Sequence, residues 1–197
     1  MKRNLKREET HNRLLETGLS LFVQQGYHGT GIKEVVDQAD LPKGSFYTYF
    51  SSKESFGGAV VDHFALKGDE RLEAVISQAK TPLEGLRRFF EISRDRLEEQ
   101  DFAGGCLFGN FSNELGAQAD EITPHLVRGM ENRSRQFAEI LEQGQAEGQV
   151  RRDMAAGTLG DLLLNGWEGA LMRAKTQRSA VPLDQFLQSY FEVMLRV

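Results

Sequence analysis

The sequence lacks the features that would place the chain in a membrane or in an oxidising compartment. It contains one cysteine, Cys106, which cannot form a disulfide within the chain, so the fold depends on packing. Apolar runs are only a few residues long, against the roughly 20 that cross a bilayer, and the charged N-terminus carries no apolar signal segment. We therefore expect a cytoplasmic protein.

Motifs of catalysis and metal binding are missing as well. The four histidines show neither HExxH nor another metal-ligand spacing; they are His11, His28, His63 and His125. Cys106 belongs to no recognisable local catalytic motif, and the chain contains neither a GxSxG elbow nor a phosphate-binding loop. The sequence therefore predicts no enzymatic activity, no metal and no cofactor.

Charge is divided unevenly along the chain. The formal net charge is -5, yet residues 1–53 carry eight Lys/Arg against six Asp/Glu, while the remainder carries 16 against 23. An acidic average argues against nonspecific nucleic-acid binding, but the basic N-terminal end is where a DNA-facing surface is expected. The basic segment Lys2–Arg7 either reaches DNA or forms a solvated arm, and both interpretations stay open.

What the sequence does contain is apolar residues at helical spacing along nearly its whole length, without the two-residue alternation of a half-buried strand. The pattern predicts an all-α fold of about nine helices, with a helix-turn-helix domain at residues 1–52 and a larger domain at residues 53–197. The first helix is expected from about Lys6 to Gln25, with Gly26 as a left-handed terminator. Ser52 is expected to cap the fourth helix, and Thr81-Pro82 to open the fifth.

Two short helices are expected between the first and the fourth. The second helix has its apolar side at Ile32, Val35, Val36 and Ala39, and Thr30 is predicted to cap it by accepting a backbone N–H. Leu41-Pro42 then breaks the chain, and a third helix begins at once over Lys43–Phe50, with Phe46 and Phe50 facing inward. Two short helices separated by a tight break predict a helix-turn-helix.

The last two helices are apolar on more than one side, which indicates that each has two neighbours. In a small protein the second neighbour is often another subunit. The residues predicted to form a dimer interface are Leu159, Leu163, Trp167, Phe186, Tyr190 and Met194.

One long motif of the sequence matches a known pattern in order, spacing and residue class. It consists of Gly26-Tyr27, Thr30-Gly31-Ile32, Val35-Val36, Ala39 and the run Leu41-Pro42-Lys43-Gly44-Ser45-Phe46-Tyr47-Thr48-Tyr49-Phe50-Ser51-Ser52-Lys53-Glu54. This motif resembles the DNA-binding domain of the tetracycline-repressor (TetR) family. Gly105-Cys106-Leu107 and Asn110 add a weaker likeness to the branch that includes repressors of N-ethylmaleimide reductase, which respond to reactive electrophiles. Membership implies an all-α homodimer that leaves its operator on ligand binding and has no enzymatic activity.

Candidate DNA contacts follow from the motif and from side-chain chemistry. Phosphate contacts are predicted for Thr30 and Gly31 at the start of the second helix and, by match to the family motif, for Tyr47, Tyr49 and Lys53. Base contacts are predicted for Lys43, Ser45 and Thr48, and Gly44 lets the backbone approach the DNA closely. For any single side chain, the alternative is an ordinary surface residue. Paired third helices would be about 34 to 36 Å apart and would require a roughly palindromic operator.

The C-terminal half concentrates aromatic and sulfur-bearing residues, which form either a plain core or the wall of an effector pocket. The candidate pocket residues are Phe64, Phe89, Cys106, Asn110, Phe111, Met130, Phe137, Trp167 and Lys175. Glu114 and Arg133 are further polar candidates on the same helices. Cys106 follows two glycines at a predicted helix start, where the helix dipole favours the reactive thiolate, and Lys175 is a candidate cationic neighbour. The alternative is a small buried cysteine without a sensing role.

A helical adaptor that binds only proteins is the main alternative function. It would explain the apolar last helices but not the hydroxyl-rich third helix. The sequence leaves open the operator, the regulated genes, the inducer, and whether the protein represses or activates.

Overall fold

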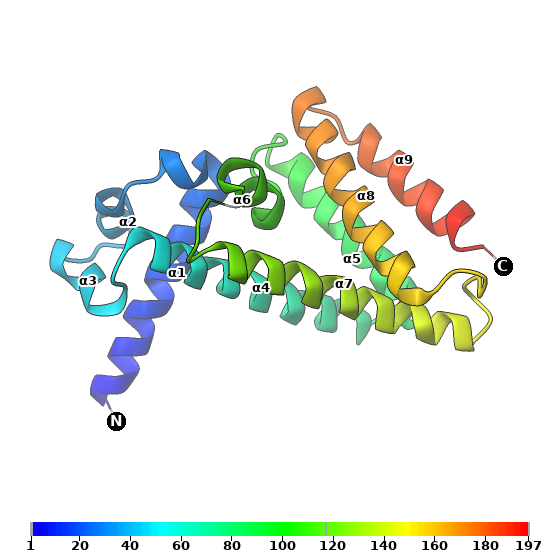
Figure 1. Cartoon of the computed structure of the whole chain (residues 1–197), viewed down its shortest axis with the longest axis horizontal. Coiled ribbons are helices and arrows are strands. Elements are labelled where there is room, and N and C mark those ends of the chain that lie inside the picture. Colours follow the sequence, from blue (N-terminus) through cyan, green and yellow to red (C-terminus); the bar gives the residue numbers. More distant parts are fainter. Residues whose placement is uncertain (1, 117, 197) are drawn as a thin grey trace. The chain divides into compact units, whose positions relative to one another are not determined.

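A computed structural model of the chain describes residues 2–116 and 118–196, without the side chains of residues 2–6 and of Lys43. Over these ranges it contains nine α-helices and no strand, which confirms the predicted all-α fold. The helices are α1 (Lys2–Gly29), α2 (Ile32–Gln38), α3 (Phe46–Tyr49), α4 (Lys53–Ile76), α5 (Pro82–Glu99), α6 (Leu107–Leu115), α7 (Thr123–Ala146), α8 (Ala156–Gln177) and α9 (Val181–Ser189) (Figure 1). Within the described residues, no helix combines the length and the apolar character that crossing a membrane requires.

The helices group into two compact units. The N-terminal unit comprises residues 1–66 and 107–129, and the C-terminal unit comprises residues 67–106 and 130–197. Helices α4 and α7 therefore contribute residues to both units. Because α6 joins the N-terminal helices, this grouping divides the chain at other places than the single boundary expected after residue 52.

The regular part of the first helix is interrupted at Gly26, the predicted terminator. It breaks there, with φ 78° and ψ 175° at Gly26, and continues for a further turn to Gly29. A Cβ atom at Gly26 would lie 2.6 Å from a carboxylate oxygen of Glu114. Glycine is thus favoured at this position both by the positive φ and by the close approach of Glu114.

The prediction that Thr30 caps the second helix is wrong. The N-cap position belongs to Gly31, and no side chain caps α2. Thr30 is 1% exposed, and its hydroxyl donates to the carbonyl oxygen of Gly26 at 2.8 Å. The break at Gly26 frees that carbonyl oxygen from the regular helical ladder, so it competes successfully for the hydroxyl.

The predicted caps of the next two long helices are confirmed. The Ser52 hydroxyl oxygen accepts from the N–H of Ser55 at 2.8 Å, directly before α4. The Thr81 hydroxyl oxygen accepts from the N–H of Glu84 at 3.1 Å, with a proline in the first turn of α5. Both caps satisfy amide donors that a helix start leaves without a partner in the helix.

Aromatic side chains form the centre of the N-terminal unit. Phe56 of α4 packs against Phe46 and Phe50, with ring centroids 5.2 and 4.8 Å apart. Phe22 of α1 contacts Phe111 of α6 at 5.1 Å. Full burial of each ring stabilises the fold by about 1.5–3 kcal/mol, so this cluster holds the short helix α3 against α4.

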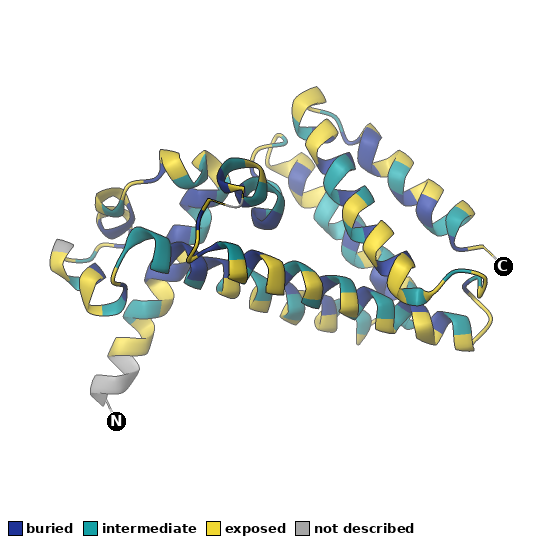
Figure 2. Ribbon diagram, in the orientation of Figure 1, coloured by how far each residue is buried: buried dark blue, intermediate teal, exposed yellow. Residues whose placement is uncertain are grey.

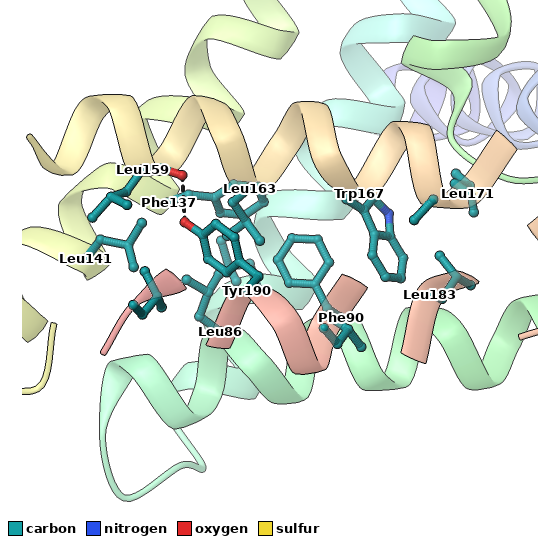
Figure 3. Packing of buried hydrophobic residues seen from close by; sticks show 14 of the residues in the cluster. Leu86, Phe90, Phe137, Leu141, Leu159, Leu163, Trp167, Leu171, Leu183 and Tyr190 are labelled. Atoms are coloured by element: carbon teal, nitrogen blue, oxygen red, sulfur yellow. Dashed lines mark hydrogen bonds between the residues drawn. The ribbon is translucent and has the colours of Figure 1, made fainter. Parts of the chain in front are cut away.

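The C-terminal unit has its own apolar core, which is drawn from five helices. Phe90 of α5 packs between Phe137 of α7 at 5.3 Å and Trp167 of α8 at 4.8 Å (Figure 3). The hydroxyl of Tyr190 points at α8 and donates to the carbonyl oxygen of Leu159 at 2.6 Å. A buried phenol thus finds its acceptor inside the core.

The predicted interface residues take different positions in this unit. Leu159, Leu163, Trp167 and Tyr190 are buried in the chain's own core, while Phe186 and Met194 are half-buried. Each helix presents buried and exposed positions in turn (Figure 2), and the buried residues of α8 belong to a core shared with other helices of the same chain. The large apolar side chains that remain exposed on the last elements are Leu162, Met172, Val181 and Val193.

Candidate nucleic-acid interface

The segment from Pro42 to Phe50 turns its aromatic anchors inward and its polar residues outward. A 3₁₀ turn at Lys43–Ser45 leads into the single turn of α3, where a continuous third helix was expected. Phe46 and Phe50 are 0% and 5% exposed, as predicted, whereas Tyr47 is 64% exposed. The segment therefore presents a polar, partly aromatic surface on a rigid apolar base.

Two hydroxyls on this surface make local hydrogen bonds. The Ser45 hydroxyl donates to the carbonyl oxygen of Pro42 at 2.5 Å, and that of Thr48 donates to the carbonyl oxygen of Gly44 at 3.5 Å. Each oxygen retains acceptor capacity, which a base amino group can use. The side chain of Lys43 lies outside the described residues.

Two glycines on this surface face open space. A Cβ atom at Gly31 or at Gly44 would meet nothing within 4 Å, and neither residue has a φ in the left-handed region. Neither glycine is therefore required by the packing of the chain itself. A backbone without a side chain at these points permits close approach by a large ligand such as the DNA backbone.

Tyr49 joins α3 to α1. Its ring is half-buried, with the His11 ring at 5.8 Å and the Arg7 guanidinium at 5.9 Å from its centroid. The cation next to the phenol adds positive charge to the same face of the unit. Tyr49 is thus partly occupied in packing, in contrast to Tyr47.

Lys53, at the start of α4, is held against the break of α1. Its ammonium donates to the carbonyl oxygen of Tyr27 at 2.6 Å and lies 4.2 Å from the centroid of the Tyr27 ring. Burial lowers the pKa of Lys53, and the nearby Glu114 carboxylate opposes that shift. Burial also raises the pKa of Tyr27, helped by Glu54, Glu121 and Glu114, so its phenol stays neutral.

Glu114 has a position that the sequence pattern did not indicate. It was expected near an effector pocket, yet its carboxylate accepts from the backbone N–H of Tyr27 at 2.8 Å and of His28 at 2.6 Å. The partners are 87 and 86 residues apart in the chain. Only the glycine at position 26, with its helix-breaking conformation, could have hinted at this contact.

The candidate effector residues divide between the two units. Phe64, Asn110 and Phe111 belong to the N-terminal unit, where Phe64 packs on Phe108 at 5.0 Å and Phe111 on Tyr27 at 5.7 Å. The members in the C-terminal unit are Phe89, Cys106, Met130, Phe137, Trp167 and Lys175. Among these, Phe137 and Trp167 are buried parts of the core.

Charged side chains surround Cys106 in the C-terminal unit. Burial raises the pKa of the nearby Glu168 carboxylate, while hydrogen bonding with this thiol and the charge of Lys175 oppose the shift. The Lys175 side chain also runs close to Gly105, where a Cβ atom would lie 3.3 Å from its Cδ.

Arg133 adds a buried cation to the same unit. It is 6% exposed, and its guanidinium pairs with Asp69 at 2.9 Å. Burial lowers the pKa of Arg133, and both Asp69 and Cys106 oppose that shift. The cysteine therefore lies within electrostatic range of a carboxylate and of a guanidinium.

The chain is all-α, and its N-terminal helix-turn-helix exposes a polar segment. This organisation is typical of a DNA-binding transcription regulator. Comparison with known proteins gives the family. Residues 14–60 match the description "Bacterial regulatory proteins, tetR family", and residues 82–190 match "Tetracyclin repressor-like, C-terminal domain". The chain belongs to the TetR family, and it is a DNA-binding transcriptional repressor regulated by an effector ligand.

Individual relatives match over nearly the whole chain. The transcriptional repressor DhaR of Mycobacterium sp. (strain GP1) is 36% identical over 190 residues, 96% of this chain and 94% of its own. A TetR regulatory protein from Rhodobacter sphaeroides has a TM-score of 0.86 at 31% identity, over 93% and 97% of the two chains. The reduced form of Escherichia coli NemR has a TM-score of 0.86 at 26% identity, over 96% and 98%.

Proposed function

We propose that the chain acts as a homodimer on a roughly palindromic operator, and that an electrophile or oxidant acting at Cys106 releases it from DNA. The observation that carries the DNA-binding part is the polar surface of Gly44, Tyr47 and Thr48 on buried Phe46 and Phe50. We further propose that residues 1–52 form the helix-turn-helix domain that carries this DNA-binding surface. The protein works in the cytoplasm by binding, without catalysis.

The proposed contacts divide into two kinds. Phosphates are met by the Gly31 backbone amide and by Tyr47, Tyr49 and Lys53, and they fix the position on the duplex. Thr30, predicted as a phosphate contact, is buried and its amide donates to the carbonyl oxygen of Tyr27 at 3.3 Å, so it supports this segment from inside. Base edges are read by Lys43, Ser45 and Thr48, and the methyl group of Thr48 suits a thymine methyl. Gly44 is the point of closest backbone approach.

Dimerisation is proposed through the last two helices. The exposed Leu162 and Met172 of α8 and Val181 of α9 support this, together with the half-buried Phe186 and Met194. The buried residues Leu159, Leu163, Trp167 and Tyr190 support the helices from inside. The predicted distance between the two third helices of a dimer is about 34 to 36 Å, one turn of DNA.

The effector proposal rests on the surroundings of Cys106. Lys175 and Arg133 supply positive charge that favours a thiolate. The similarity to NemR, a repressor whose reduced form has been solved, supports a redox-sensitive function. With N-ethylmaleimide, the thiolate sulfur bonds to one alkene carbon, and the other alkene carbon takes a proton from water.

A mobility shift on the DNA upstream of the protein's own gene tests the proposal. The wild type is expected to shift this DNA and to release it after N-ethylmaleimide treatment. Cys106→Ser should bind equally well and resist release, and mass spectrometry should find one adduct on the wild type only. Full release of the variant would refute the thiol mechanism. Absence of any DNA shift would favour the protein-binding adaptor.

A further inference from the structure

The Glu114 carboxylate lies where the N-terminal unit binds two adjacent backbone amides. It belongs to the last turn of α6, and its oxygens accept from the N–H groups of Tyr27 and His28 at 2.8 and 2.6 Å. The positive φ at Gly26 turns these amides out of the regular ladder of α1, and the missing Cβ leaves room for the carboxylate. The contact is a charge-assisted pair of hydrogen bonds between distant parts of the chain.

The same residue, Tyr27, also holds Lys53. Its carbonyl oxygen accepts from the Lys53 ammonium at 2.6 Å, and its ring lies 4.2 Å below that cation. Glu114 and Lys53 thus bind opposite ends of one residue. The carboxylate also stabilises the charged form of Lys53 at a distance, against the effect of burial.

We propose that Glu114 is a positioning residue for DNA binding: by fixing Tyr27 it places the Lys53 ammonium for its contact with a DNA phosphate. This inference rests on the proposed phosphate contact of Lys53. An ammonium has three donors, so the hydrogen bond to Tyr27 leaves others for a phosphate. Lysine has a long, flexible side chain, and holding it in place before binding reduces the entropy lost on contact.

A simple charge argument predicts the opposite effect for Glu114. Removing a carboxylate from a DNA-binding unit lowers the repulsion with phosphates and should tighten binding. Positioning of Lys53 predicts weaker binding after the same substitution. The direction of the change therefore separates the two explanations.

The experiment measures affinity for operator and for random DNA between 50 and 200 mM KCl, with the full-length protein. Lys53→Ala should flatten the slope of log affinity against log salt by about 0.9 per subunit, the value for one phosphate contact. Glu114→Ala should weaken binding to both DNAs and flatten the slope by nearly the same amount. The double variant should match either single variant.

Thr81→Ala is the control, because it removes a helix cap from the C-terminal unit and has no link to Lys53. It should lower the melting temperature and leave the salt slope unchanged.

If Glu114→Ala does not fold, Glu114→Gln keeps one acceptor oxygen and should give a slope between wild type and Lys53→Ala. A wild-type slope in the Glu114 variants, tighter binding, or additive slopes in the double variant would overturn the positioning role. An unchanged slope in Lys53→Ala would instead refute the proposed phosphate contact of Lys53, on which the positioning role of Glu114 depends.

Discussion

Gly44→Ala should change the stability of the fold and the affinity for DNA in opposite directions, because no atom of the described part of the chain packs where the added methyl group would lie. A Cβ atom at this position meets nothing within 4 Å, and the φ of Gly44 is outside the left-handed region. Alanine reduces the conformational freedom of the unfolded chain, so the variant should be more stable by about 0.4–1 kcal/mol. For a chain of this size that corresponds to a rise of about 1 to 4 °C in melting temperature.

Operator binding should change in the opposite direction. If the DNA backbone approaches Gly44 as proposed, the added methyl group stands in its path, and we expect a loss of at least about tenfold in affinity, or about 1.4 kcal/mol. Fluorescence anisotropy with labelled operator measures the affinity, and thermal unfolding measures the stability of the same samples.

Gly157→Ala is the matched control for this variant. Gly157 is exposed in the first turn of α8, and a Cβ atom there also meets nothing within 4 Å. The control should gain stability and bind the operator like the wild type. Wild-type affinity of Gly44→Ala would show that DNA does not approach this segment, and the proposed orientation of α3 would be wrong. A lower melting temperature would contradict the open space around Gly44.

Two further predictions concern stability. Phe56→Ala should lower the free energy of unfolding by about 3–5 kcal/mol in denaturant titrations, because the fully buried ring contacts Phe46 and Phe50; a loss below about 1 kcal/mol would contradict this packing. Burial raises the pKa of Glu168 above its ordinary value of 4.5. Between that value and the raised pKa the native chain binds more protons than the unfolded chain, so the native chain loses stability as the pH rises from 4.5 through the raised pKa. Glu168→Gln should therefore gain stability over wild type above pH 4.5 and converge with it below; a pH-independent difference would contradict the shift.

The sequence determined the features of this protein that depend on neighbours along the chain. Helical spacing of apolar residues gave the all-α fold, because a buried stripe recurs every three to four residues whatever covers it. Caps such as Ser52 and Thr81 were predictable because the hydroxyl and its amide partner are three residues apart. Phe46 and Phe50 were correctly placed inward for the same local reason.

The tertiary structure decided which partner each side chain meets. An apolar stripe on α8 indicates that this side of the helix is covered, but it does not indicate which element covers it. Trp167 packs on Phe90 of the chain's own α5, and Leu163 is buried in the same core. Thr30 turned inward because the break at Gly26 offered a carbonyl oxygen, which no capping rule anticipates. Glu114 reaches amides 87 and 86 residues away, and periodicity within one helix carries no information about a contact of that range.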